Sequence, residues 1–170
     1  MIRKLVVSGD WHIPFHDEKA LKLLFKFLKE WQPDTLILNG DIIDCYDISK
    51  FRKVPTDEGT MENEIEMARN ILGKLREILP QTRIIYIEGN HEMRWKKMLI
   101  EESPKFYKLY RKFVGGYEIH LDYFLNCHKY NIEYKPIREE LDKFSHNYIE
   151  INGVYIGHFA KINRNAGYTA

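Results

Sequence analysis

Residues 83–92 read RIIYIEGNHE, and this stretch decides the fold. Its first part, 83–87, is a short apolar run rich in β-branched residues, which is typical of a buried strand. The run stops before Gly89, and three residues with oxygen or nitrogen donor atoms follow, namely Asn90, His91 and Glu92. We therefore predict a strand that delivers a polar loop to the edge of a sheet.

The same arrangement occurs twice nearer the N-terminus. An apolar run at 4–8 leads into Gly9-Asp10-Trp11-His12, and another at 35–39 leads into Gly40-Asp41-Ile42-Ile43-Asp44. A helical pattern separates each strand from the next. This order predicts parallel strands in an α/β fold, and parallel strands bring the three polar loops to one edge of the sheet.

Both intervening helices carry start and stop signals. The first begins after Asp17, a good N-cap residue, and ends before Pro33, while the second begins after Thr60 and ends before Pro80. Their apolar residues recur at helical spacing: Leu21, Leu24, Phe25, Leu28 and Trp31, then Ile65, Ala68, Leu72, Leu75 and Leu79. The polar stretch from Asp44 to Thr60 predicts a loop over the strand ends.

The segment 93–146 is basic, Tyr-rich and less regular. Helical spacing continues through 93–113 with a break at Pro104, and 121–130 predicts another short helix. We expect a single domain over 1–170 in which the segment 93–146 forms a helical insert or cap.

The last predicted elements are two short strands, 147–151 and 154–159. They flank Asn152-Gly153, a dipeptide typical of the two-residue turn of a β-hairpin. The second strand carries Gly157-His158 near its end, so His158 joins the residues that strands deliver.

Composition excludes several classes of protein. The chain has 170 residues with 26 Lys and Arg against 25 Asp and Glu, and this net charge of +1 argues against binding to nucleic acid or membrane through bulk charge. Its apolar runs are far shorter than the roughly 18 residues that span a bilayer, and no signal-peptide core follows the N-terminus. Cys45 and Cys127 stand alone, which argues against a disulfide framework. We expect a soluble, cytoplasmic protein with no membrane partner.

The residues after the strands form the pattern of a metal site. Carboxylate and amide oxygens with imidazole nitrogens suit Mn²⁺, Fe or Zn²⁺. Each residue also has an ordinary structural explanation, because Asp41 and Asp44 could cap a helix and His158 could lie in the core. Those explanations do not account for the recurrence of such residues after successive strands.

The blocks Asp10-x-His12, Gly40-Asp41-x-x-Asp44, Gly89-Asn90-His91-Glu92 and the later His158 resemble the calcineurin-like metallophosphoesterase family in type and order. The resemblance implies a four-layer sandwich in which helices flank two sheets. It also implies that Asp10 and His12 bind one metal ion, that Asn90 and His158 bind another, and that Asp41 bridges both. Mn²⁺ is the first expectation for these two divalent ions, with Fe, Zn²⁺ or Ni²⁺ as alternatives.

The same resemblance assigns catalytic roles. Two ions would hold a hydroxide that attacks phosphorus, so no protein nucleophile is required. His91 would donate a proton to the leaving oxygen, and Asp44 would orient and charge its imidazole. Arg94, three residues after His91, is a candidate phosphate contact. A His-Glu-x-x-His protease helix is excluded because Trp95 stands in place of the second histidine.

The sequence departs from the family at its C-terminal end. The family's last block, Gly-His-x-His, is missing before Ala170. We therefore expect a domain that lacks its C-terminal part and leaves about three protein ligands for each ion.

The sequence leaves the substrate open. Residues 94–112 contain seven Lys or Arg against two Glu, interleaved with aromatic residues. They form either a solvated helix face or a track for a nucleic-acid backbone. The main hypothesis is a phosphoester hydrolase with a lean to phosphodiester or nucleic-acid substrates. The alternative is a catalytically inactive module that acts in binding or assembly.

Overall fold

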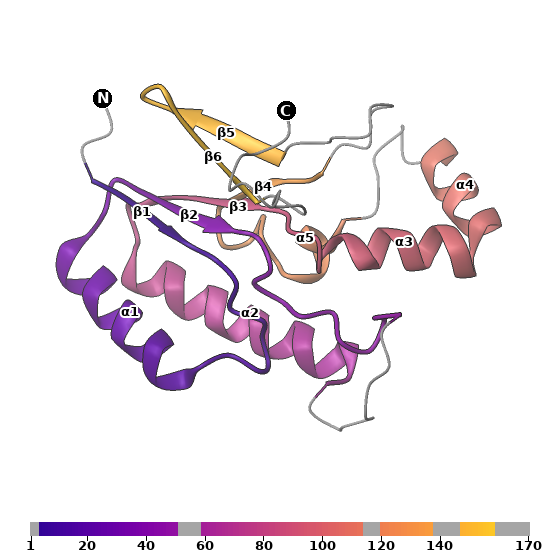
Figure 1. The fold of residues 1–170 in the computed structure, drawn as a ribbon, viewed down its shortest axis with the longest axis horizontal. Coiled ribbons are helices and arrows are strands. Elements are labelled where there is room, and N and C mark those ends of the chain that lie inside the picture. The colour runs from indigo at the N-terminus through magenta and orange to yellow at the C-terminus, as the bar shows by residue number, and fades with distance from the viewer. Residues whose placement is uncertain (1–3, 51–58, 114–119, 138–146, 159–170) are drawn as a thin grey trace, which may run out of the picture.

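The computed structural model describes residues 4–50, 59–113, 120–137 and 147–158 (Figure 1). In chain order its elements are β1 (Leu5–Ser8), α1 (Glu18–Trp31), β2 (Thr35–Asn39), α2 (Met61–Ile78), β3 (Arg83–Ile87), α3 (Met93–Glu102), α4 (Pro104–Phe113), α5 (Leu121–Phe124), β4 (Ile132–Lys135), β5 (Asn147–Ile151) and β6 (Val154–His158). None of the helices in these ranges is long and apolar enough to cross a membrane.

A parallel sheet with strand order β1-β2-β3-β4 forms the centre of the molecule. Its register places Leu38 beside both Ser8 and Tyr86, so the first three strands end at nearly the same level. The loops that follow them therefore emerge together at one edge of the sheet. This confirms the predicted parallel order.

The two faces of this sheet are covered differently. Leu36, Leu38 and Tyr86 pack into one core with residues of α1 and α2, while Ile37 and Ile85 pack into a second core with Ile151 of β5. Side chains alternate between the faces of a strand, so strands that are apolar throughout must be covered on both sides. Figure 1 shows α1 and α2 on one face and the β5–β6 hairpin on the other.

The predicted α/β fold with two sheets is therefore confirmed. The described residues supply three layers of the expected four-layer sandwich: helices, parallel sheet and antiparallel hairpin. On the hairpin, Tyr148, Val154 and Tyr155 are exposed, and no helix within the described ranges covers them.

Both long helices begin and end where the sequence predicted. The Asp17 side chain accepts hydrogen bonds from the amides of Lys19 and Ala20, and Thr60 accepts from the amide of Asn63. Ala68, Leu72 and Leu75 of α2 are fully buried. The first part of the expected loop after Asp44 is described as far as Lys50, and residues 51–58 lie outside the description.

The segment 93–146 contains an element that the sequence analysis did not predict. Strand β4 pairs in parallel with β3 and extends the sheet, whereas the helix expected at 121–130 is limited to α5, Leu121–Phe124. β4 was missed because it is only four residues long, so the alternation of Ile132 and Tyr134 with Glu133 and Lys135 is too short to be a clear strand pattern. Residues 114–119 and 138–146 of this segment lie outside the described ranges.

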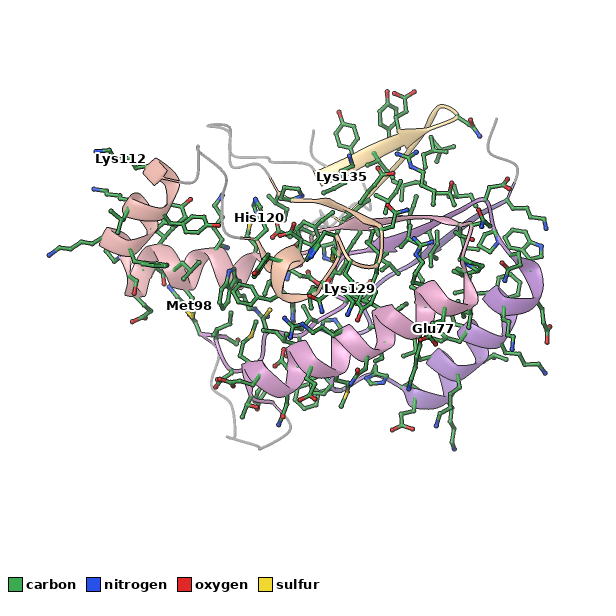
Figure 2. The ribbon with its side chains drawn as sticks, turned by 180° about the vertical axis from the view of Figure 1, so that it is seen from behind. Glu77, Met98, Lys112, His120, Lys129 and Lys135 are labelled. Carbon is green, nitrogen blue, oxygen red and sulfur yellow. The ribbon has the colours of Figure 1, made fainter. Side chains whose placement is uncertain are left out.

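The predicted break at Pro104 is confirmed, because α3 ends at Glu102 and α4 begins at Pro104. α4 packs on α3 and extends away from the sheet. Figure 2 shows Lys112 of α4 at the end of the molecule opposite α1, and Met98 of α3 lies closer to the sheet.

The predicted hairpin is confirmed as far as His158, and residue 159 lies outside the description.

Candidate metal centre

Three loops converge at the carboxyl ends of β1, β2 and β3. The amide of Asp10 donates to the carbonyl of Gly40 at 3.0 Å, and the amide of His12 donates to the carbonyl of Asp41 at 2.9 Å. Asp10, His12 and Asp41 have φ values of 54°, 53° and 50°. The left-handed region is uncommon for such residues, and strained backbone of this kind concentrates at functional sites.

Two glycines permit the loops to approach so closely. A Cβ atom on Gly89 would overlap the backbone and carboxylate of Asp41, and one on Gly40 would lie 2.6 Å from the His158 ring. Gly40 also has a φ of +73°, a conformation that glycine adopts without steric cost. The glycines of both blocks are therefore required by the contact between loops.

Asp10, Asp41 and His158 form one group of ligand atoms, all within 4.8 Å of one another. His158 Nε2 lies 3.3 Å from Asp41 Oδ2 and 3.0 Å from Asn90 Oδ1. Its other nitrogen, Nδ1, lies 2.9 Å from the Asn39 carbonyl oxygen. The structure thus brings together Asp41, Asn90 and His158, the residues predicted to hold the second ion.

Charge complementarity holds this group together. The hydrogen bond to Asp41 raises the pKa of His158 to about 9, although burial opposes the charged imidazole. Burial alone would raise the pKa of Asp41, but hydrogen bonds from His158 and the His91 amide outweigh it and lower the pKa. A charged His158 therefore compensates the negative charge of the Asp41 carboxylate.

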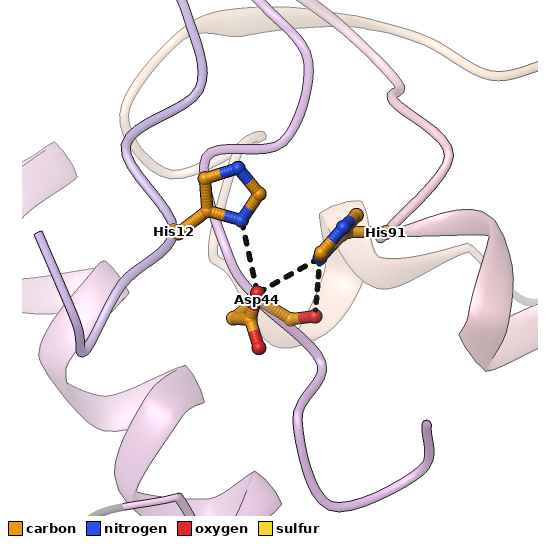
Figure 3. Close-up of side chains that lie close together, drawn as sticks. All are labelled: His12, Asp44 and His91. Carbon is orange, nitrogen blue, oxygen red and sulfur yellow. Dashed lines mark hydrogen bonds and ion pairs between the residues drawn. The ribbon is translucent and has the colours of Figure 1, made fainter. Parts of the chain in front are cut away.

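His12, Asp44 and His91 form the second group of ligand atoms (Figure 3). Asp44 Oδ1 lies 2.9 Å from His12 Nδ1 and 2.9 Å from His91 Nδ1. The two imidazole rings meet edge to face with centroids 4.5 Å apart. Burial opposes a charged Asp44, but the hydrogen bonds to His91 and His12 lower its pKa. This carboxylate can therefore orient both rings.

His91 also contacts two other groups of the site. Its Nε2 lies 2.9 Å from Arg94 Nη2 and 3.8 Å from Asp41 Oδ2, while Arg94 Nη1 donates to the Asp44 carbonyl at 2.9 Å. Burial lowers the pKa of His91, but Asp44 and Asp41 outweigh burial, so the pKa is raised overall. Arg94 thus lies beside His91, on the same side as the sequence predicted.

The structure divides the predicted ligands differently from the sequence analysis in one respect. Asp10 and Asp41 share a group, but His12, predicted to join them around the first ion, lies with Asp44 and His91. His16 and His128 belong to neither of these two groups. The individual metal and catalytic assignments remain predictions.

Two buried carboxyl groups support the site and were not identified as functional from the sequence. Glu92 bonds to amides of the Asp41 loop and to Tyr86, and Glu64 of α2 bonds to the amides of Cys45 and Tyr46. Glu92 is part of the Gly-Asn-His-Glu block, which is a signal that could have identified it. Glu64 had no such signal, because an acidic residue in the first turn of a helix is ordinary.

An open cleft of about 590 Å³ adjoins the site. Asn90 and Arg94 line it together with Lys97 and Met98 of α3, and the loop after Asp44 forms part of its wall. Asp47, Glu101 and Glu102 also line it, so the cleft presents both cationic and acidic side chains.

The donor set fits divalent metal ions. Each group supplies carboxylate oxygen and imidazole nitrogen at the spacing of a shared ion, and Asn90 adds an amide oxygen beside His158. Mixed oxygen and nitrogen sites without thiolate suit ions such as Mn²⁺, Fe²⁺ and Zn²⁺. The two cysteines are buried, and neither belongs to these groups.

Comparison with known proteins agrees with this chemistry. The chain matches the calcineurin-like phosphoesterase family over residues 3–165. It is 29% identical over 107 residues to the Gene 54 protein of Mycobacterium phage L5, and 32% identical over 97 residues to the Gene 54 protein of Mycobacterium phage D29. These matches cover 61% and 55% of this chain but 42% and 38% of the phage proteins, so the chain spans about two fifths of these curated relatives.

Proposed function

The chain belongs to the calcineurin-like phosphoesterase family, and from this membership we propose that it hydrolyses a phosphoester with two divalent metal ions. The observation that carries the proposal is the meeting of two ligand groups, Asp10–Asp41–His158 and His12–Asp44–His91, at one edge of the sheet. In our assignment the first group contributes Asp10 to one ion, His158 to the other and Asp41 to both. The second group holds an imidazole beside a carboxylate, as proton transfer requires.

We assign Asp10, His12 and Asp41 to one ion, and Asp41, Asn90 and His158 to the other. Mn²⁺ is our first candidate for both. Divalent ions supply an activated water and neutralise the charge that develops on the phosphate. For His12 to bind this ion, its ring must leave Asp44 and turn toward Asp10. Asp44 would keep its bond to His91.

His91 donates the proton to the leaving oxygen in this proposal. Asp44 holds Nδ1, so Nε2 is the atom that faces the substrate. Arg94 now lies 2.9 Å from Nε2, and its guanidinium can bind phosphate oxygens in a bidentate manner. An incoming phosphate would therefore draw Arg94 away from the ring and leave Nε2 for the leaving group.

We propose a phosphodiester as the substrate, with nucleic acid as the favoured source. The support comes from two helices. Residues of α3 line the cleft, and α4 continues from the end of α3 as a basic helix. Helix α4 contains Lys105, Lys108, Arg111 and Lys112 and no acidic residue, and Phe106 and Leu109 are 52% and 54% exposed. Basic residues interleaved with an exposed aromatic side chain, that of Phe106, suit a single-stranded backbone and its bases.

The test combines metal counting with turnover. The protein is stripped with a chelator and titrated with Mn²⁺ by calorimetry, and hydrolysis of a chromogenic phosphodiester is then measured. We expect two Mn²⁺ sites per chain and metal-dependent turnover. A His91→Ala variant should keep Mn²⁺ binding and lose activity by about 100-fold or more.

Each part of the proposal can fail separately. A chain that binds no Mn²⁺, Fe²⁺ or Zn²⁺ would reject metal-dependent hydrolysis. Equal turnover by wild type and His91→Ala would reject His91 as the proton donor. Metal binding without any turnover would favour the alternative, a module of this fold that acts in binding or assembly.

A further inference from the structure

The loop that carries Asp41 and Asp44 has an unusual set of hydrogen bonds. Asp44 donates its amide to the Ile13 carbonyl at 2.9 Å, but the other amides from Asp41 to Tyr46 donate to only two side chains, Glu92 and Glu64. The backbone turns at Asp41 and Cys45, which both have a φ of 50°. Such turns prevent a regular ladder, so the buried amides need side-chain acceptors.

Glu92 ties this loop to the loop after β3. Its Oε2 accepts from the amides of Asp41 at 3.0 Å and Gly89 at 2.8 Å. Its Oε1 accepts from the amides of Ile42 at 2.8 Å and Ile43 at 3.3 Å. Tyr86 Oη, from β3, donates to the same Oε1 at 2.6 Å. Glu92 is fully buried, so these donors replace its hydration.

Glu64 holds the other end of the same loop. Its Oε2 accepts from the Cys45 amide at 2.6 Å, and its Oε1 accepts from the Tyr46 amide at 2.8 Å. It lies in the first turn of α2 and is fully buried. A buried carboxyl group is costly, and an apolar residue would normally occupy such a position. The contact fixes the residues that directly follow Asp44.

We propose that Glu92 and Glu64 are positioning residues of the active site: Glu92 sets the place of Asp41, and Glu64 sets the place of Asp44. This inference rests on the proposed function, because it concerns the ligand and the orienting carboxylate assigned there. Both act through backbone amides, which leaves the side chains of Asp41 and Asp44 directed at His158 and His91. Groups that orient metal ligands typically change metal affinity by about 10-fold to 100-fold when mutated.

The two carboxyl groups should therefore affect different readouts. In Glu92→Gln, the remaining side-chain oxygen can still accept from the amides that it contacts. The new NH₂ group is a donor and cannot accept from the amides on its side, so those bonds are lost. We expect Mn²⁺ affinity to fall by about 10-fold or more. In Glu64→Gln, Asp41 stays in place, so Mn²⁺ affinity should stay close to that of wild type while kcat falls and KM does not change.

Glu88→Gln is the matched control. Glu88 is also buried at the end of β3, but its carboxylate accepts from the Ile137 amide and from Tyr134 Oη of β4. Mn²⁺ affinity is measured by calorimetry for each variant whose circular dichroism matches that of wild type. Amide hydrogen exchange is measured without metal, where Glu92→Gln should speed exchange at 41–43 and Glu64→Gln at 45–46.

The outcomes separate this inference from the proposed function. If folded Glu92→Gln binds Mn²⁺ as tightly as Glu88→Gln, the role of Glu92 is overturned while metal binding stands. If wild type binds no Mn²⁺, the proposed function fails, and unchanged exchange at 41–46 in the variants would overturn the positioning role as well. Should Glu92→Gln not fold, Glu92→Asp repeats the comparison, because its shorter side chain keeps the charge but cannot reach both loops.

Discussion

Asp41 and His158 form an ion pair, with 3.3 Å between Oδ2 and Nε2, that joins the end of β2 to the end of the hairpin strand β6. The pair links the two sheets at the point where the predicted ligands meet. Removing one partner of a largely buried pair leaves the other charge without compensation.

The first prediction concerns this pair. His158→Ala removes a proposed ligand and the partner of Asp41, so we expect Mn²⁺ affinity at one site to fall by at least about 10-fold. Calorimetric titration of the chelator-treated protein measures it. His128→Ala is the control, because His128 is exposed and belongs to neither ligand group. Equal Mn²⁺ affinity in both variants would remove His158 from the metal site.

The second prediction concerns the contact between loops at Gly89. In Gly89→Ala the added methyl group overlaps Asp41, so the two loops must separate. We expect the free energy of unfolding to fall by about 1–3 kcal/mol and Mn²⁺ binding to weaken. Gly73→Ala is the control, because the atoms nearest to its methyl group would be those at the end of the Tyr130 side chain, which belongs to neither ligand group. Thermal unfolding and calorimetry test both, and full Mn²⁺ affinity in Gly89→Ala would contradict the requirement for glycine.

The third prediction concerns the dependence of stability on pH. Burial raises the pKa of Glu64 to about 7 from its ordinary value of 4.5, and the two amide bonds only partly oppose this. A pKa that is higher in the folded state means that the folded state binds the proton more tightly. The protonated Glu64 therefore contributes its full stabilisation of the folded state below pH 4.5, and this contribution is lost as the pH rises through about 7.

A Glu64→Gln variant isolates this effect, because glutamine does not titrate. Relative to the variant, wild type should lose stability between pH 4.5 and 7, by an amount on the order of 3 kcal/mol. Urea unfolding at a series of pH values measures the difference. A constant difference across this range would show that Glu64 is ionised throughout and would contradict the prediction.

The fourth prediction concerns Asp44. Asp44→Asn removes the carboxylate that stabilises the protonated form of His91. We therefore expect turnover of a phosphodiester to fall by about 100-fold while Mn²⁺ affinity changes little. The comparison with His91→Ala is informative, since two residues that act as one unit should have effects that do not add. A double variant much slower than either single variant would argue against a shared role.

Much of this architecture is encoded locally. Strands β2 and β3 are apolar on both faces, and the glycines that end the blocks mark where the chain turns, so the sheet and its loops could be predicted. β4 could not, because its four residues are too few for their alternation of apolar and charged side chains to stand out from the surrounding polar sequence. Sequence patterns also identify which residues gather at the sheet edge but not which ones touch. The contact of His12 with Asp44, and the hold of Glu64 on the amides of 45–46, arise from packing between distant elements.

The last prediction concerns the basic helix α4. If α4 carries a nucleic-acid backbone, replacing Lys105, Lys108 and Lys112 with Glu should weaken binding of a single-stranded oligonucleotide and reduce its dependence on salt. Replacing Lys19, Lys26 and Lys29 of α1 makes the same change in net charge on a distant helix, where we expect a much smaller effect. Fluorescence anisotropy at several salt concentrations distinguishes the two. Equal losses in both variants would indicate attraction by net charge alone, and no binding by wild type at low salt would remove nucleic acid from the proposed substrates.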